Sequence, residues 1–85
     1  MKIRRTKTFK KQYQKLPLRS QQQFDARLKL WLVDPKHPSL RVHQLQGNKR
    51  GYWSLNVTGD LRALYYFEDK TTVVFVLIGT HSQLY

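Results

Sequence analysis

The feature that most limits the possible folds is a change of hydrophobic period at a proline-containing loop over residues 34–41. Before this loop, apolar residues recur every three or four positions, which is typical of one face of an α-helix. After it, apolar and polar residues alternate, as they do along a half-buried β-strand. Helices followed by strands predict an α+β fold, with the helices packed on one face of a sheet.

Two helices are expected before the loop. Thr6 or Thr8 can cap the first helix, and Pro17 ends it. The second helix is expected over about residues 18–33 and ends before Pro35, because a residue that precedes proline is pushed out of the helical region. The side chains expected to face the core are Phe9, Tyr13, Leu16, Phe24, Leu28, Trp31 and Leu32. A short strand is also expected over residues 2–5, before the first helix.

The alternating half predicts an antiparallel meander. Its strands are expected over residues 42–45, 52–57, 61–67 and 71–78, with a three-residue hairpin loop at residues 58–60. The last strand is nearly all apolar, so we expect it to be the central strand of the sheet. A chain of 85 residues can bury one core, which predicts a single domain over residues 1–85.

The composition indicates a basic, folded protein. Sixteen Lys and Arg against five Asp and Glu give a net charge of +11, which predicts a polyanionic partner such as nucleic acid or an anionic membrane. A hydrophobic content of 40% excludes a disordered basic tail. The absence of cysteine excludes a disulfide scaffold and a thiolate zinc site. No apolar run approaches the ~20 residues that span a bilayer, so a cytoplasmic location is expected.

Metal and nucleotide sites are not expected. The three histidines, His37, His43 and His81, have neither the spacing of a metal site nor an adjacent acid to orient them. Neither glycine of the turn before residue 52 belongs to a phosphate-binding loop. We therefore predict no metal and no cofactor.

Cationic and proton-exchanging side chains instead gather around the predicted strands. Arg62 interrupts an apolar strand, Asp60 lies two residues before it, and the pair Lys49–Arg50 occupies a turn. His81 and Tyr85 follow the last strand. Strand ends that are distant in sequence meet in a meander. We therefore expect one sheet surface to bring together Arg62, His81, Tyr85 and the Lys49–Arg50 turn.

Each of these residues also has a purely structural interpretation. Arg62 can face solvent or pair with Asp60, and the Lys49–Arg50 turn can simply be solvated. His43 and His81 can be ordinary surface residues. The basic side chains of the first helix either form a solvated face or contact phosphates, which would release counterions and add affinity. These side chains are Lys7, Lys10, Lys11 and Lys15.

An ordered set of motifs in the second half of the chain resembles the RelE/ParE superfamily of toxins. The motifs are residues 43–47 (HQLQG), 51–54 (GYWS), 60–65 (DLRALY) and 78–85 (IGTHSQLY). The last of them is most similar to the YafQ branch, and the second also resembles HigB toxins. The similarity covers about residues 40–85, and the helical hairpin before it agrees in order.

The resemblance implies a β-α-α-β-β-β fold and a function as the toxin of a type II toxin–antitoxin pair. Its YafQ and RelE branches enter the ribosomal A site and cut mRNA without a metal ion, through attack of the RNA 2′-OH on the adjacent phosphate. The expected partners are therefore the ribosome, mRNA and a cognate antitoxin. That antitoxin should be acidic where it contacts a chain of charge +11.

The resemblance also suggests roles for individual residues. His81 matches the family's C-terminal histidine, a general acid or base, and Tyr85 matches the aromatic residue that holds the nucleobase. His43 matches a second functional histidine. Asp60 matches an active-site acid, and Arg62 an arginine that is frequent in other branches. We expect Lys49, Arg50, Lys7, Lys10 and Lys11 to contact RNA.

The chain departs from the YafQ pattern on one strand, and two other functions stay open. Ser54 and Asn56 stand where YafQ-like toxins have an acid and a histidine, so the division of catalytic roles is not settled by the motif. A ParE-like inhibitor of DNA gyrase is the first alternative, although that activity needs no histidine near the end of the domain. A basic RNA-binding module without catalysis is the second.

Overall fold

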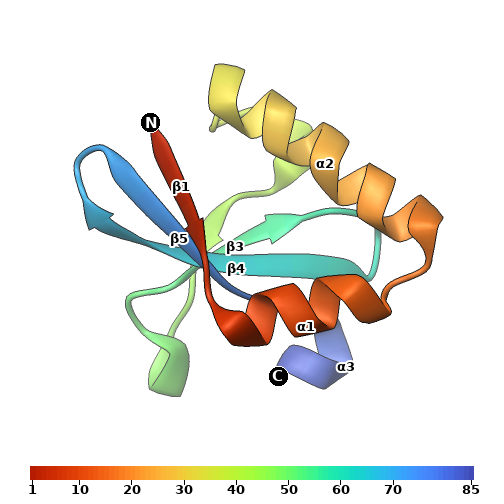
Figure 1. Ribbon diagram of the computed structural model, residues 1–85. Coiled ribbons are helices and arrows are strands. Elements are labelled where there is room, and N and C mark those ends of the chain that lie inside the picture. The colour runs from red at the N-terminus through yellow and green to blue at the C-terminus, as the bar shows by residue number, and fades with distance from the viewer.

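The computed structural model describes all 85 residues as a five-stranded sheet with helices on both faces (Figure 1). Two helices longer than two turns lie on one face, and a single-turn helix lies on the other. None of the helices is long and apolar enough to cross a membrane. The elements in chain order are β1 (Lys2–Arg5), α1 (Lys7–Lys15), α2 (Leu18–Val33), η1 (Pro38–Leu40), β2 (His43–Gln44), η2 (Gly47–Lys49), β3 (Trp53–Asn56), β4 (Leu61–Asp69), β5 (Thr72–Thr80) and α3 (His81–Leu84).

The strands follow the order β1-β5-β4-β3-β2 across the sheet. Strands β2 to β5 form the expected antiparallel meander, and β1 pairs parallel with β5 because the helical hairpin carries the chain back across the sheet. The prediction that β5 is the central strand is wrong by one place. β5 is an interior strand, as its apolar sequence indicates, but β4 occupies the middle of the sheet.

Both long helices begin and end close to the positions that the sequence predicts. The Thr6 hydroxyl accepts a hydrogen bond from the amide of Phe9 at 3.1 Å and so caps α1. The same hydroxyl donates to the carbonyl of Val76 at 3.1 Å, which ties the start of α1 to β5. α1 ends before Pro17, and α2 ends at Val33, two residues before Pro35.

The main core lies between the helices and the sheet. Phe24, Leu28 and Trp31 of α2 are buried, as predicted, but Leu32 is 47% exposed. Leu32 follows Trp31 by one helical step of about 100°, which turns its side chain away from the sheet. The buried core comprises Phe9, Phe24, Leu28, Trp31, Leu40, Leu55, Val57, Leu61, Ala63, Tyr65, Val73, Phe75 and Ile78.

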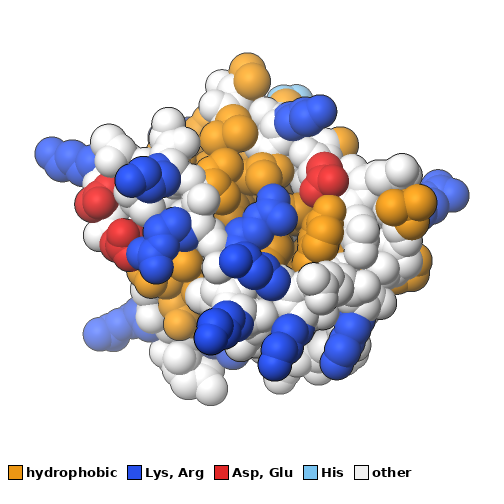
Figure 2. All heavy atoms as spheres, viewed as in Figure 1, with side chains coloured by type: hydrophobic (Ala, Val, Ile, Leu, Met, Phe, Trp, Pro, Cys, Tyr) orange, Lys and Arg blue, Asp and Glu red, His pale blue; other side chains and the backbone are white.

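The surface of the helical face is apolar in the middle and basic around it. Figure 2 shows apolar side chains between α1 and α2 and a row of Lys and Arg side chains over α1. Within the apolar region, the Arg5 guanidinium lies 5.5–5.7 Å from the ring centroids of three aromatic residues, Phe9, Tyr13 and Phe24. α1 thus lines one side of this face with positive charge.

Helix α3 covers the opposite face of the sheet, and the sequence prediction missed it. Thr80 and Gln83 form a reciprocal capping box that starts the helix directly after β5. Leu84 then packs against Leu45 and Leu64 in a second, smaller apolar cluster. This single turn determines where His81 and the residues after it lie.

Candidate active site

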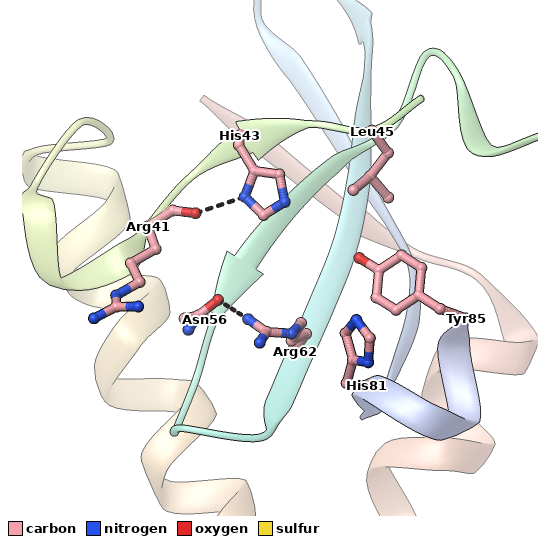
Figure 3. A pocket seen from close by; sticks show the side chains of 7 residues that line it. All are labelled: Arg41, His43, Leu45, Asn56, Arg62, His81 and Tyr85. Atoms are coloured by element: carbon pink, nitrogen blue, oxygen red, sulfur yellow. Dashed lines mark hydrogen bonds between the residues drawn. The ribbon is translucent and has the colours of Figure 1, made fainter. Parts of the chain in front are cut away.

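A cavity of about 340 Å³ opens on the face of the sheet that carries α3 (Figure 3). β2 forms one wall, β3 and β4 form the floor, and α3 forms the other wall. Seven residues line it: Arg41, His43, Leu45, Asn56, Arg62, His81 and Tyr85. Four of these, His43, Arg62, His81 and Tyr85, were predicted as site residues from the sequence.

The strand register aligns the floor of the cavity. Asn56, Arg62 and Gly79 are paired across β3, β4 and β5, so they form one row across the sheet. The absence of a side chain at Gly79 allows α3 to fold back closely, because a Cβ there would lie 2.9 Å from the Gln83 Oε1 atom and 3.4 Å from Leu84. The row therefore brings Arg62 beneath the helix that carries His81.

Arg62 contributes the positive charge at the floor of the cavity. Its side chain is half-buried, and its guanidinium donates a hydrogen bond to the side-chain oxygen of Asn56. The interpretation that Arg62 pairs with Asp60 is wrong, because the only salt bridge in the structure joins Arg4 and Glu68. The amide of Asn56 is neutral, so the charge of Arg62 stays available to an anion in the cavity.

His81 and Tyr85 form the α3 wall together. Their rings are 4.6 Å apart between centroids, at an interplanar angle of 37°. The backbone amide of His81 donates to the carbonyl of Asp60 at 3.1 Å, and the carboxylate Oδ1 of Asp60 lies 3.4 Å from the same amide. Asp60 thus holds the backbone of His81 in place and does not touch its imidazole.

His43 lies on the opposite wall, on edge strand β2. Its Nδ1 atom is 2.9 Å from the backbone carbonyl oxygen of Arg41. Figure 3 shows the other ring nitrogen of His43 on the side of the cavity, across from Arg62 and His81. The cavity therefore places two imidazoles around one guanidinium. Histidine is the side chain that most often serves as a general acid or base in enzymes.

One family model matches the sequence of this chain. The family model described as "Bacterial toxin of type II toxin-antitoxin system, YafQ" matches residues 1–85, which is the whole chain. The chain belongs to the YafQ toxin family. It is therefore a toxin of a type II toxin–antitoxin system, its family consists of mRNA interferases, and its partner is an antitoxin. The resemblance inferred from the motifs is confirmed.

Solved structures with the same fold include several toxins. YafQ from Escherichia coli strain BL21(DE3) is 23% identical, with a TM-score of 0.83 over 98% of this chain and 96% of that one. The YoeB/ParE toxin from Agrobacterium tumefaciens is 20% identical, with a TM-score of 0.79 over 95% and 99% of the two chains. The E. coli DinJ–YafQ toxin–antitoxin complex is 24% identical, with a TM-score of 0.77 over 98% and 94%. No curated protein sequence shows significant similarity to the chain.

Three residues that line the toxin's cavity were not among the predicted site residues. Arg41 and Leu45 lie two positions before and after His43, so the two-residue period of a strand could have placed all three on one face. Asn56 was noticed only as a departure from the family pattern. Its register opposite Arg62 gives it a partner that the sequence alone did not reveal.

Ser54, the other departure, does not line the cavity. It pairs with His43 on one side and Leu64 on the other, and its side chain is fully buried. Its hydroxyl has no hydrogen-bond partner within the protein. An unpaired hydroxyl in an apolar environment reduces stability, and the hydroxyl of Ser54 makes no contact that would orient a group of the site.

The remaining predicted site residues lie outside the cavity. Asp60 is exposed on the loop before β4, and the predicted RNA-contacting residues are distributed over η2 and α1. Those residues are Lys49, Arg50, Lys7, Lys10 and Lys11. No group of three or more His, Asp or Glu side chains lies close enough together to hold a metal ion.

Proposed function

We propose that this toxin cleaves mRNA in the ribosomal A site by metal-independent transesterification, with His43, Arg62 and His81 as its catalytic residues. The observation that carries the proposal is their convergence, from β2, β4 and α3, on one cavity. Membership in a family of mRNA interferases supports the nuclease activity. Translation takes place in the cytoplasm, where the toxin would therefore act.

The reaction needs one base, one acid and a cation. The base takes the proton of the 2′-OH, and the 2′ oxygen then forms a bond to the adjacent phosphorus. The bond between phosphorus and the 5′ oxygen breaks, and the acid protonates that oxygen, which leaves a 2′,3′-cyclic phosphate and a 5′-OH. His43 and His81 can supply the base and the acid, because a histidine side chain can serve in either role in proton transfer.

Arg62 fits the role of stabilising the transition state. The phosphorane formed during attack carries extra negative charge, and fixed donors directed at that charge lower the barrier. The hydrogen bond to Asn56 fixes the guanidinium without neutralising it. Arg41 adds a second guanidinium to the same cavity. These two arginines would supply the positive charge that a metal ion could otherwise provide.

RNA binding would involve Tyr85 and the basic residues outside the cavity. Tyr85 lines the cavity and is 49% exposed, so its ring is accessible for stacking on an unstacked base. The cations of α1 and η2 would contact phosphates of mRNA or ribosomal RNA. The same positive charge supports an antitoxin that is acidic where it covers this protein.

The test is mapping of mRNA 5′ ends in a reconstituted translation reaction. The wild-type toxin, His81→Ala and the control His37→Ala would be compared with and without ribosomes. His37 lies outside the cavity, next to η1. New ends within codons are expected with the wild type and with His37→Ala, only when ribosomes are present, and none with His81→Ala.

Two outcomes would contradict the proposal. Intact mRNA in all reactions would exclude the nuclease activity, and gyrase-dependent DNA breaks would then favour the ParE-like alternative. Full cleavage by His81→Ala would exclude His81 from the chemistry.

A further inference from the structure

Arg41 has an unusual backbone. It is the only non-glycine residue with a positive φ, and its angles of 47° and 43° place it in the left-handed helical region. Side chains other than that of glycine are disfavoured there, because the Cβ atom crowds the backbone. Arg41 adopts this conformation at the end of η1, where its amide donates to the carbonyl of Pro38 at 3.2 Å. Such strain at a functional site points to a role.

The strained residue directs its own carbonyl at a histidine. The carbonyl oxygen of Arg41 lies 2.9 Å from Nδ1 of His43. A carbonyl can only accept a hydrogen bond, so Nδ1 must carry the proton. In the neutral imidazole the other nitrogen, Nε2, is then a free acceptor. Figure 3 shows that nitrogen on the cavity side of the ring.

We infer that the left-handed backbone of Arg41 is a positioning device that fixes His43 as the base of the reaction. This inference rests on the proposed function. Nε2 of His43 would accept the proton of the 2′-OH while the bond from the 2′ oxygen to phosphorus forms. Breaking of the bond to the 5′ oxygen would then draw a proton from His81. The carbonyl of Arg41 also stabilises the cation that His43 becomes.

The side chain of Arg41 explains why a glycine would serve this position less well. Glycine adopts the left-handed conformation without cost, and it would keep the carbonyl in place. It would, however, remove a guanidinium from the lining of the cavity. Arginine therefore combines two contributions at one position, because its backbone orients His43 and its side chain adds a positive charge to the lining of the cavity.

Variants at Arg41 separate these two contributions. Arg41→Asn and Arg41→Gly tolerate the left-handed backbone but lack the cation. Arg41→Val lacks the cation too, and its β-branched side chain disfavours that backbone. Arg41→Lys keeps the cation and the same backbone preference as arginine. The comparison of Asn with Val thus isolates the backbone, because both remove the charge.

The decisive measurement identifies which ring nitrogen of His43 carries the proton in the free toxin. It is read from the ¹⁵N NMR shifts of the ring, at a pH at which the imidazole is neutral. We expect the proton on Nδ1 in the wild type and in the Lys, Asn and Gly variants, and a mixture of both tautomers in Arg41→Val. A proton mainly on Nε2 in the wild type would overturn the inference whatever the cleavage assay shows. Unchanged tautomers in a folded Arg41→Val would overturn it as well.

Single-turnover mRNA cleavage gives the second readout. We expect the rate of the chemical step to fall by a similar factor in Arg41→Asn and Arg41→Gly. In Arg41→Val that rate should be at least tenfold lower still, without a matching change in RNA affinity. Equal rates for the folded Asn and Val variants would contradict the inference. A wild-type toxin that does not cleave RNA but keeps the Nδ1 proton would contradict the proposed function and leave the orientation of His43 confirmed.

Discussion

Asn56 of β3 and Arg62 of β4 are paired across adjacent strands, and the Arg62 guanidinium donates a hydrogen bond to the side-chain oxygen of Asn56. The family pattern leads one to expect a histidine where Asn56 stands. In this toxin the position supports a cation instead of exchanging a proton itself. Under the proposed mechanism, proton transfer would then fall to His43 and His81, on the two walls of the cavity.

Replacing Arg62 by alanine should slow mRNA cleavage at least tenfold, which corresponds to about 1.4 kcal/mol of transition-state stabilisation. The reason is that the phosphorane would lose the cation held beneath it. Single-turnover kinetics on ribosomes measure the effect directly. Arg19→Ala, which removes an exposed arginine from α2, is the matched control and should cleave at the wild-type rate. Equal rates for both variants would remove Arg62 from the mechanism.

Tyr85→Ala should weaken binding of the RNA substrate by about 1–3 kcal/mol, the usual effect of losing one aromatic stacking partner. Tyr85→Phe keeps the ring and should bind nearly as the wild type does. The measurement is the dependence of the cleavage rate on mRNA–ribosome concentration. If Tyr85→Phe loses as much RNA affinity as Tyr85→Ala does, the hydroxyl of Tyr85 contributes to binding and its ring does not.

The lysines of α1 should determine part of the salt dependence of ribosome binding. Three phosphate contacts contribute a slope of about 2–3 to the plot of log affinity against log salt concentration. Changing Lys7, Lys10 and Lys11 to glutamine should therefore flatten that plot by about this amount. A variant with glutamine at Lys29, Lys36 and Lys70 has the same net charge and serves as the control. If both triple variants change the slope equally, the effect comes from overall charge and α1 has no special role.

Much of the fold follows from local sequence signals. The hydrophobic periods and the prolines predicted α1 and α2 and most of the core, because these signals act within a few residues. The parallel pairing of β1 with β5 was not predicted, since it joins residues about 70 positions apart and depends on the whole helical hairpin.

Four of the seven residues that line the cavity were predicted from the sequence, but the geometry of the site was not. The meander brought Arg62, His81 and Tyr85 together as expected, and His43 joins them, but the Lys49–Arg50 turn does not line the cavity. The capping box that starts α3 is visible in the sequence as Thr80 followed by Gln83, but one turn of helix is too short to produce a hydrophobic period. The carbonyl of Arg41 is a backbone group, so no residue type could reveal its contact with His43.

Ser54→Ala should raise the free energy of unfolding by about 1 kcal/mol, because it removes a buried hydroxyl that has no hydrogen-bond partner. Cleavage should not change. Urea denaturation measures the difference. Ser39→Ala is the control, because the hydroxyl of Ser39 accepts a hydrogen bond from Arg27 at 2.9 Å. Removal of this hydroxyl should not raise the free energy of unfolding. A loss of stability in Ser54→Ala would show that the hydroxyl has a partner.

Tyr65 should make the toxin sensitive to alkaline pH. Burial raises the pKa of Tyr65 above its ordinary value of 10.0, and the hydrogen bond from Trp31 opposes this shift more weakly. Because the pKa is raised in the folded state, the stability that Tyr65 contributes is complete below pH 10. It is lost as the pH rises through the higher folded value. The pKa of Tyr13 is also raised, mainly by burial. Tyr65 therefore accounts for only part of the stability that is lost at alkaline pH.

Tyr65→Phe should therefore have opposite consequences at neutral and alkaline pH. At pH 7 the variant should be less stable by about 1–3 kcal/mol, because the Trp31 indole N–H, which donates to the Tyr65 hydroxyl at 3.1 Å, is left buried without an acceptor. Above pH 10 its stability should fall less steeply than that of the wild type. Urea denaturation between pH 7 and pH 11 tests both effects, with Tyr66→Phe as the control at a half-buried tyrosine. Parallel curves for Tyr65→Phe and the wild type would mean that Tyr65 is not responsible for the alkaline loss.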